Sequence, residues 1–401
     1  MKPVLLFRAV ALLCSLALST AVCAQKKYDT GATDTEIKIG QTMPYSGPAS
    51  SYGQIGRAEM AYFQKINDEG GINGRKIKLI SLDDGYSPPK AVEMIRRLVE
   101  QDEVLFVFQS LGTPSNSAIH KYMNAKKVPQ LFVATGATKW GDPKDFPWTM
   151  GWQPNYQTEG RIYAKDILTN LPNAKVAVLY QNDDYGKDLL KGLKDGLGDK
   201  ASKVIVAEAS YEVSDPTVDS QIVSLRGSGA DVFINITTPK FSALAIRKVY
   251  DIGWKPVHYL NNVGASVGSV LVPAGLEKAV GLVTVAYLKD AVDTQWSNDP
   301  GMKDFLAFMA KYVPDGKISD SNNVYGYSVA QTLVQVLKQC GDDLTRANVM
   351  RQAANLKNLQ LPLALPGVKI NTSPTDFYPF ESLQLQRFDG KQWVLYGSVI
   401  E

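Results

Sequence analysis

Short strand-like runs alternate with helix-like patterns along most of this chain, and the alternation starts twice. The first series begins after Thr33, and a second series of the same kind begins near Lys175. Strands that alternate with helices form parallel sheets covered by helices, so the sequence predicts an α/β fold with two doubly wound units. The expected strands are residues 36–41, 75–83, 104–109, 129–134, 175–181, 203–208 and 231–236. The expected helices are residues 53–67, 90–101, 186–197, 217–225, 241–251, 301–313, 323–339 and 345–356.

Residues 148–158 separate the two series and are rich in proline, glycine and aromatic residues, which indicates a crossing between two lobes. After Ala286 the pattern is mostly helical and has too few strand-like runs for a core of its own. We expect this part to return to the first lobe, and a strand pair within residues 380–400 to join the second. The expected boundaries are residues 34–152 with 287–375 for the first lobe and residues 153–286 with 376–401 for the second.

The first 24 residues have the pattern of a secretory signal peptide. Lys2 and Arg8 precede an apolar run at residues 9–18, and small residues lead to Ala24, after which we expect cleavage. Cys23 lacks the preceding residues of a lipid-attachment site, so we expect export without a lipid anchor. No later apolar stretch reaches the roughly 18–20 residues that span a bilayer.

Charge and cysteine content exclude two further features. The chain has 43 Lys and Arg residues against 40 Asp and Glu residues, and two of these cations lie in the signal peptide. No run of basic residues follows it, so nucleic acid is not an expected partner. Cys14 and Cys23 also lie in the signal peptide, which leaves Cys340 without a partner for a disulfide. We expect Cys340 to pack near the end of a helix.

Residues 264–268 match the G-x-S-x-G motif of serine hydrolases, so an esterase has to be considered. In that fold the histidine follows the serine, whereas His120 and His258, the only histidines, both precede Ser266. Two histidines without spaced partners do not indicate a zinc site, and no phosphate-binding glycine motif follows an expected strand. We therefore expect a protein that is not an enzyme and that needs no metal or cofactor.

Ligands of open α/β sheets bind beyond the carboxyl ends of the strands, where helix N-termini present unpaired N–H groups. Two loops at such positions, residues 110–116 and 135–138, are rich in small and hydroxyl-bearing residues. They are suited to hold a carboxylate with neutral donors, although the same composition also serves simply to cap helices and form turns. In the second unit the corresponding loops contain Tyr185, Thr238 and Asn261.

Three motifs, at residues 37–48, 67–77 and 83–92, occur in the order found in a known family, and the central one begins Asn-Asp-Glu-Gly-Gly-Ile-Asn-Gly-Arg. They resemble the periplasmic leucine/isoleucine/valine-binding-protein family of ABC transporters, over essentially the whole chain after the signal peptide. The resemblance implies a type I periplasmic binding fold, in which two α/β lobes joined by three crossings close on a ligand. It also implies a periplasmic monomer that passes a small carboxylate to an ABC permease in the inner membrane.

The resemblance places the ligand site as well. In the first lobe the family's pocket corresponds to Tyr52, Leu111, Gly112, Thr113, Gly136, Ala137 and Thr138, which would hold the carboxylate, and in the second lobe to Tyr185, Thr238 and Asn261. Amino-acid binders of this family have an acidic residue in the loop that matches residues 261–264, where it pairs with the ligand's ammonium. Here that loop holds amides and small residues. Because a buried ammonium without a partner is costly, we expect a carboxylate that lacks an α-amino group.

Aromatic residues suggest the ligand class. Residues 139–140, 147–152 and 323–327, with the apolar strand at 131–133, resemble the subgroup that binds aromatic acids, so a benzoate or cinnamate type of ligand is expected. The alternative is that these aromatic residues pack between the lobes. Rival functions are a branched-chain amino-acid receptor in which Asp183 or Asp184 binds the ammonium, a sensor domain for a signalling partner, and, more remotely, the hydrolase.

Overall fold

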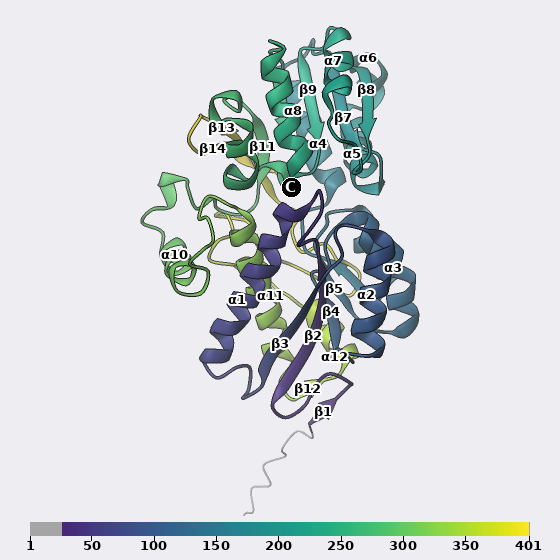
Figure 1. Cartoon of the computed structure of the whole chain (residues 1–401), viewed down its shortest axis with the longest axis vertical. Helices are drawn as coiled ribbons and strands as arrows, with labels where there is room; N and C mark the ends of the chain where they lie inside the picture. The colour runs from purple at the N-terminus through teal and green to yellow at the C-terminus, as the bar shows by residue number, and fades with distance from the viewer. Residues whose placement is uncertain (1–25, 401) are drawn as a thin grey trace, which may run out of the picture.

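The computed structural model describes residues 26–400. The expected signal peptide and its two cysteines lie outside the described residues. Figure 1 shows two α/β lobes stacked along the long axis of the molecule, each built on its own sheet. The chain passes between the lobes three times, after Gly151, after Ala286 and before Leu383. The predicted fold class, two doubly wound α/β lobes joined by three crossings, is therefore confirmed.

The sheet of the first lobe has five parallel strands in the order β3-β2-β4-β5-β6. They are β2 (Glu36–Met43), β3 (Lys76–Asp83), β4 (Phe106–Phe108), β5 (Gln130–Val133) and β6 (Thr149–Gly151). Every residue of β4 and β5 is buried, which explains their mainly apolar sequence. Since all five strands run in one direction, their carboxyl ends lie together at the edge that faces the second lobe.

Helices cover both faces of this sheet. The helices of the first lobe are α1 (Gly53–Asp68), α2 (Pro88–Glu100), α3 (Thr113–Lys126), α10 (Pro300–Tyr312), α11 (Asn322–Cys340) and α12 (Arg346–Ala353). Helices α1 and α11 pack against each other on one face, and α2 and α3 pack against each other on the opposite face. Ile55, Tyr62 and Ile66 give α1 a buried face at the spacing that the sequence predicts. Cys340 is buried at the end of α11, as expected.

The sheet of the second lobe has seven strands in the order β14-β13-β11-β10-β9-β7-β8. The parallel strands are β7 (Val176–Gln181), β8 (Ile205–Tyr211), β9 (Val232–Ile236), β10 (Val257–Leu260) and β11 (Val283–Ala286). The strand pair β13 (Leu383–Phe388) and β14 (Trp393–Ile400) joins β11 in antiparallel orientation, at the place in the chain where the sequence predicts a strand pair.

The helices of the second lobe are α4 (Tyr156–Asn170), α5 (Asp184–Leu197), α6 (Ala201–Val204), α7 (Asp219–Gly227), α8 (Pro239–Asp251) and α9 (Val272–Ala274). Helices α4 and α5 pack tightly against each other, because Gly160 and Gly192 lie at their contact. Helix α4 and strands β10 and β11 were not expected from the sequence, and neither were the short helices α6 and α9.

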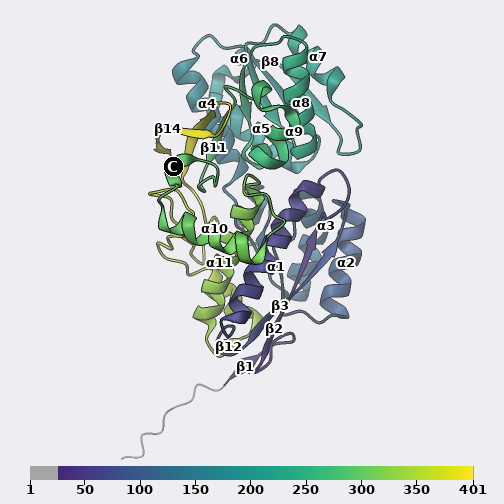
Figure 2. The same ribbon diagram turned by 60° about the vertical axis from the view of Figure 1, so that its left-hand side comes forward.

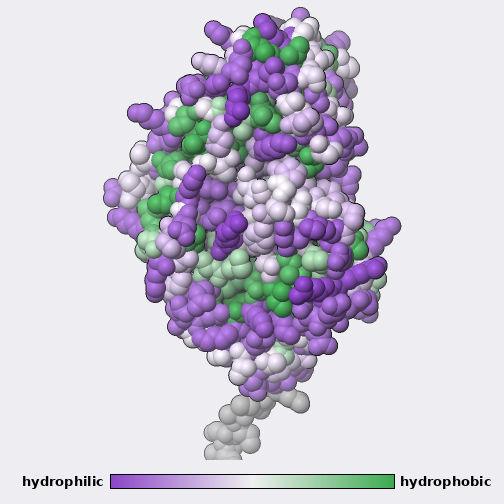
Figure 3. Space-filling model, in the orientation of Figure 1, coloured by the Kyte–Doolittle hydropathy of each residue, from purple (hydrophilic) through white to green (hydrophobic). Residues whose placement is uncertain are grey.

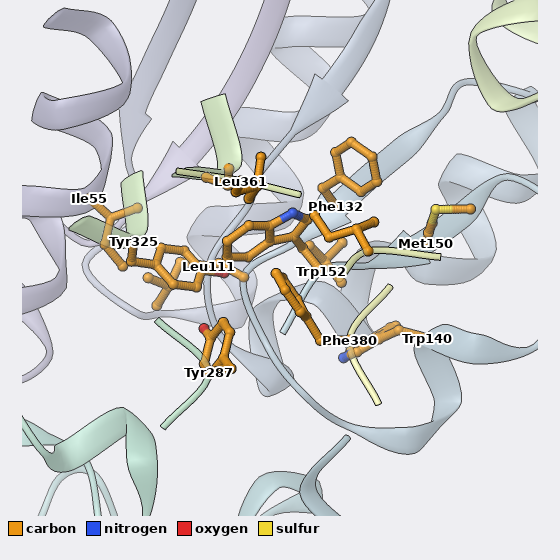
Figure 4. Close-up of a cluster of buried hydrophobic side chains, with 14 of the residues drawn as sticks. Ile55, Leu111, Phe132, Trp140, Met150, Trp152, Tyr287, Tyr325, Leu361 and Phe380 are labelled. Atoms are coloured by element: carbon orange, nitrogen blue, oxygen red, sulfur yellow. The ribbon is translucent and has the colours of Figure 1, made fainter. Parts of the chain in front are cut away.

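An aromatic cluster joins the three crossings (Figure 4). Trp152, Tyr287 and Phe380 come from the first, second and third crossing, and the ring of Trp152 lies 6.1 Å from that of Tyr287 and 5.0 Å from that of Phe380. The indole N–H of Trp152 donates to Thr332 Oγ1 at 3.1 Å, which fixes the cluster to helix α11. Trp152 is fully buried, so this part of the expected aromatic stretch packs between the lobes.

On the face shown in Figure 3, hydrophilic residues cover most of the surface and hydrophobic residues gather in small separate areas. Among residues 26–400 no helix is both long enough and apolar enough to cross a bilayer. The short strand β1 (Lys27–Tyr28) pairs with β12 (Asp343–Leu344) at the end of the first lobe that is remote from the second lobe (Figure 2).

Candidate functional site

A cavity lies between the lobes. Much of its wall is formed by residues that follow parallel strands of the two sheets, which is the usual place for a ligand in such sheets. Six tyrosines line it, namely Tyr52, Tyr86, Tyr156, Tyr185, Tyr287 and Tyr325. Each tyrosine presents a flat apolar ring and one hydroxyl, so the wall suits a flat apolar body with polar ends.

The structure brings together part of the site that the sequence predicts. Tyr52, Leu111, Gly112, Thr113, Tyr185 and Thr238 line the cavity. The other expected residues, Gly136, Ala137, Thr138 and Asn261, are not among the lining residues. The two loops that hold these four residues have other partners, which are described below.

The N-terminus of α3 opens onto the cavity. The helix begins at Thr113, and the preceding residue, Gly112, has no side chain that could cap it. The hydroxyl of Thr113 is paired with that of Thr135 at 2.6 Å and does not cap the helix either. The first N–H groups of a helix have no partner inside the helix and carry partial positive charge. This end of the cavity is therefore suited to a carboxylate.

Tyr185 supplies a hydroxyl without a partner on the other side of the cavity. Its side chain is 2% exposed, and within the described residues its hydroxyl has no hydrogen-bond partner. Asp183 fixes its backbone, because the Asp183 carboxylate accepts the N–H groups of Tyr185 and Gly186 at the start of α5. Burial raises the pKa of Tyr185 well above its usual value, so the hydroxyl stays protonated and can donate to a ligand.

The loop after β5 turns away from the cavity. The backbone N–H of Thr138 donates to Asp188 of helix α5 at 2.8 Å, and its hydroxyl donates to the same carboxylate at 2.9 Å. The carbonyl of Thr138 accepts the hydroxyl of Tyr378 at 2.7 Å. Gly136 lies directly against Pro154 and Tyr156 of the first crossing. This loop thus connects the two lobes beside the crossings, and the polar groups of Thr138 are already occupied.

The loop after β10 approaches the cavity with a different residue from the one expected. Asn261 is 1% exposed, and its side-chain oxygen accepts the N–H of Thr237 at 3.1 Å, which ties the loop to strand β9. Its neighbours Asn262 and Val263 line the cavity instead. The carbonyl of Val263 accepts the hydroxyl of Tyr52 at 3.0 Å, so the two lobes touch across the cavity here.

Asp183 and Asp184, the acids that would bind the ammonium in a branched-chain amino-acid receptor, have other partners and lie outside the cavity. The Asp183 carboxylate caps α5, as described above. Asp184 forms an ion pair with Lys139 at 2.6 Å, and its side chain is 63% exposed. Neither residue lines the cavity. Two charged residues that were not predicted from the sequence, Lys289 and Asp290, do line it. They follow β11, a strand that was not expected.

The G-x-S-x-G segment does not form a nucleophile and base pair. The hydroxyl of Ser266 donates to the Asp320 carboxylate at 3.0 Å. His258 is instead paired with the side chain of Asn235 at 3.1 Å. Burial also lowers the pKa of His258 to about 3. The segment therefore has a structural role, because it forms part of a contact between the lobes.

Glu159 of α4 is expected to make the folded state less stable as the pH rises. Its carboxylate accepts the backbone N–H of Asn262 and the hydroxyl of Tyr163, each at 2.7 Å, and burial raises its pKa to about 7. Because this folded-state pKa lies above the unfolded value, the stabilisation is complete below about pH 4 and is lost as the pH rises to about 7. A shift of this size corresponds to about 3 kcal/mol.

Urea unfolding at pH 5 and pH 8 tests this expectation on the wild type and on Glu159→Gln. The glutamine is neutral at both pH values, so the variant should lack this part of the pH dependence. Equal pH dependence in the two proteins would show that Glu159 titrates normally.

Two α/β lobes with a tyrosine-lined cavity between them are typical of proteins that bind a small ligand between two lobes. The periplasmic binding protein family matches residues 36–392, and the chain therefore belongs to this family. The "Amino acid binding protein" of Pseudomonas aeruginosa is 25% identical over 317 residues, which cover 76% of this chain and 79% of that protein. "Leu/Ile/Val-binding protein homolog 7" of Brucella abortus is 25% identical over 323 residues, covering 75% and 77%.

Solved structures show the same fold at lower identity. A fatty acid ABC transporter substrate-binding protein from Thermomonospora curvata has a TM-score of 0.78 at 23% identity, covering 94% of this chain and 95% of that chain. A branched chain amino acid ABC transporter protein from Thermus thermophilus with bound valine has a TM-score of 0.81 at 16% identity, covering 92% and 97%. The fold is thus shared by proteins whose names refer to chemically different ligands.

Proposed function

We propose that this protein is exported to the periplasm with removal of residues 1–24 and binds a small carboxylate that lacks an α-amino group. An aromatic acid of the benzoate or cinnamate type is the preferred ligand, and an ABC permease receives it. The observation that carries this proposal is the uncapped N-terminus of α3, which opens onto a cavity lined by six tyrosines. The first lobe is proposed to comprise residues 34–152 and 287–375, and the second residues 153–286 and 376–401.

The polar groups of the cavity support a carboxylate at one end. Thr113 brings the first backbone N–H group of α3 to the cavity, whereas the N–H of Gly112 already donates to the carbonyl of Ala134 at 3.3 Å. The unpaired hydroxyl of Tyr185 adds a neutral donor from the second lobe. Neutral donors hold a carboxylate without a buried countercharge. The tyrosine rings of the wall offer flat faces on which an aromatic ring stacks well.

The absence of an α-amino group is supported by the loop after β10. In that loop Asn262 and Val263 line the cavity, and neither carries a charge that would pair with an ammonium. Asp183 and Asp184 are engaged elsewhere. An amino acid whose ammonium entered this part of the cavity would lose its hydration without gaining an ion pair.

A branched-chain amino-acid receptor is the second candidate. The names of the relatives from Brucella abortus and Thermus thermophilus favour it, and so does Asp290, a carboxylate on the cavity wall. In this case Asp290 would have to pair with the ammonium while α3 holds the carboxylate of the same ligand.

A thermal-shift screen of the ligand-free protein separates the two candidates. A ligand that binds only the folded state stabilises it by about 2.7 kcal/mol at one hundred times its Kd. Benzoate and cinnamate are expected to raise Tm, whereas leucine and valine are expected to leave it unchanged. Benzylamine, which has the ring but no carboxylate, is the matched control and should also be inactive. Stabilisation by α-amino acids alone would refute the proposed ligand class.

A further inference from the structure

The cavity has two chemically different ends. One end is formed by the start of α3, and the other includes the start of α11 at Asn322. These two helices lie on opposite faces of the five-stranded sheet (Figure 1). A ligand that reaches from one end to the other must therefore pass the carboxyl ends of the strands in this sheet.

Asp290 belongs to the second end. It lies on the crossing that follows β11 and lines the cavity. Within the described residues its carboxylate has one hydrogen bond, from the N–H of Val292 to Oδ1 at 3.0 Å. Burial, with smaller contributions from Asp293 and Asp320, raises its pKa to about 6, so the group is mostly ionised at neutral pH. A second oxygen thus remains to accept a hydrogen bond.

The charged neighbours of Asp290 are occupied by other partners. Lys289 forms an ion pair with Asp299 at 2.6 Å and donates to the carbonyl of Pro362 at 2.8 Å. The Asp293 carboxylate accepts the N–H of Gln295 at 3.0 Å. The Asp320 carboxylate accepts the hydroxyl of Ser266 at 3.0 Å. Asp290 is therefore the acid of this group that is left for a ligand.

We propose that Asp290 accepts a hydrogen bond from a donor at the end of the ligand that is remote from its carboxylate. The cargo is then a carboxylate that carries a hydroxyl or a protonated amine at its far end. This inference rests on the proposed function, because it takes the carboxylate to be bound at α3. In an α-amino acid the ammonium lies next to the carboxylate, so it is not the remote donor that this inference requires.

The expected selectivity follows from the cost of an unpaired acceptor. A ligand without the remote donor removes water from Asp290 and returns no hydrogen bond. Sites that are built around such a hydrogen bond discriminate strongly against analogues that lack the donor. The tyrosine rings then select a ligand by its shape, and Asp290 selects it by the donor group that it carries.

Isothermal titration calorimetry on the wild type provides the first test, and it needs no variant. The ligands are benzoate, 4-hydroxybenzoate and 4-(aminomethyl)benzoate. Binding of at least one donor-bearing acid is expected to be about tenfold tighter than that of benzoate, or more. Equal affinities for all three acids would overturn this inference and leave the proposed function intact. If none of the carboxylates binds, the proposed function and this inference are both refuted.

Variants identify the residue responsible and the kind of donor. Asp290→Ala removes the acceptor and should bind the three acids with equal affinity. Asp290→Asn keeps a neutral acceptor, so it should lose a preference for the amine but keep part of a preference for the hydroxyl. Asp293→Asn is the matched control, since it removes a nearby negative charge whose carboxylate is used within its own loop. Equal loss of preference in Asp293→Asn and Asp290→Ala would show that regional charge causes the selectivity, which would overturn the proposed contact.

Discussion

Gly112→Ala is expected to abolish tight ligand binding and to lower Tm. Gly112 has φ 96° and ψ 135°, a conformation that residues with a side chain rarely adopt. An added Cβ would also lie 2.5 Å from Cε2 of Tyr86, another cavity residue. Backbone strain and overpacking together cost about 2–6 kcal/mol. Because relief of the clash displaces Tyr86 or the start of α3, we expect the affinity for the carboxylate to fall at least about tenfold.

Gly70→Ala is the matched control for this prediction. Gly70 has φ 104°, close to that of Gly112, but a Cβ there would meet no atom within 4 Å. Its replacement should therefore lower Tm through backbone strain alone and leave the affinity unchanged. Titration calorimetry and thermal unfolding on both variants measure the two effects. Wild-type affinity in Gly112→Ala would show that the start of α3 is not part of the binding site.

Gly268→Ala is expected to hold the lobes apart. Gly268 belongs to a contact between the lobes. Its backbone N–H donates to the carbonyl of Ser319 at 2.7 Å, and the hydroxyls of Ser266 and Ser269 on either side of it donate to the Asp320 carboxylate. Residues 266–269 belong to the second lobe, whereas Asp320 lies two residues before the start of α11 in the first lobe. An added Cβ would lie 2.6 Å from Ser319 Oγ and 2.8 Å from the backbone nitrogen of Asp320. The closed form is then disfavoured, and we expect ligand affinity to fall at least about tenfold.

Small-angle X-ray scattering with saturating ligand measures this effect directly. The radius of gyration of Gly268→Ala should stay above that of the liganded wild type, because the lobes cannot meet at this contact. Gly227→Ala is a suitable control, since a Cβ at Gly227 in the same lobe would meet no atom within 4 Å. A variant Gly268→Ala that closes and binds like the wild type would show that this contact plays no part in closure.

The periodic elements of the fold could be predicted because their sequence patterns are long. Helices α1 and α11 and strands β2 and β3 appear within a few residues of their expected bounds. Helix α4 was missed for a physical reason. It packs on α5 through Gly160, where an added Cβ would lie 2.5 Å from the carbonyl oxygen of Leu189. The buried face of α4 therefore has a glycine at a position where a larger apolar residue would have revealed the helical pattern. Strands β10 and β11 have four residues each, and His258 and Thr284 interrupt their apolar runs. Strands β4 and β5 are as short, but they contain uninterrupted apolar runs and were predicted for that reason.

Site residues could be predicted from the sequence where they follow strands that were themselves predicted. Thr113 and Tyr185 follow expected strands and begin helices, and both line the cavity. Tyr287 and Asp290 follow β11, so no sequence argument placed them at the end of a strand. Thr138 follows an expected strand, but its hydrogen bonds to Asp188 come from the other lobe and could not be inferred from the local sequence.

The lobes are units of the fold but not of the sequence. Gln54 at the start of α1 and Asn323 at the start of α11 form a hydrogen bond of 2.7 Å, although 269 positions separate them in the chain. The second lobe in turn takes β13 and β14 from the last residues described. A fragment that ends after β11 would lack the helix that covers α1 and the strand pair beside β11. A chimera that exchanges one lobe with that of a relative must therefore join the two chains at all three crossings at once.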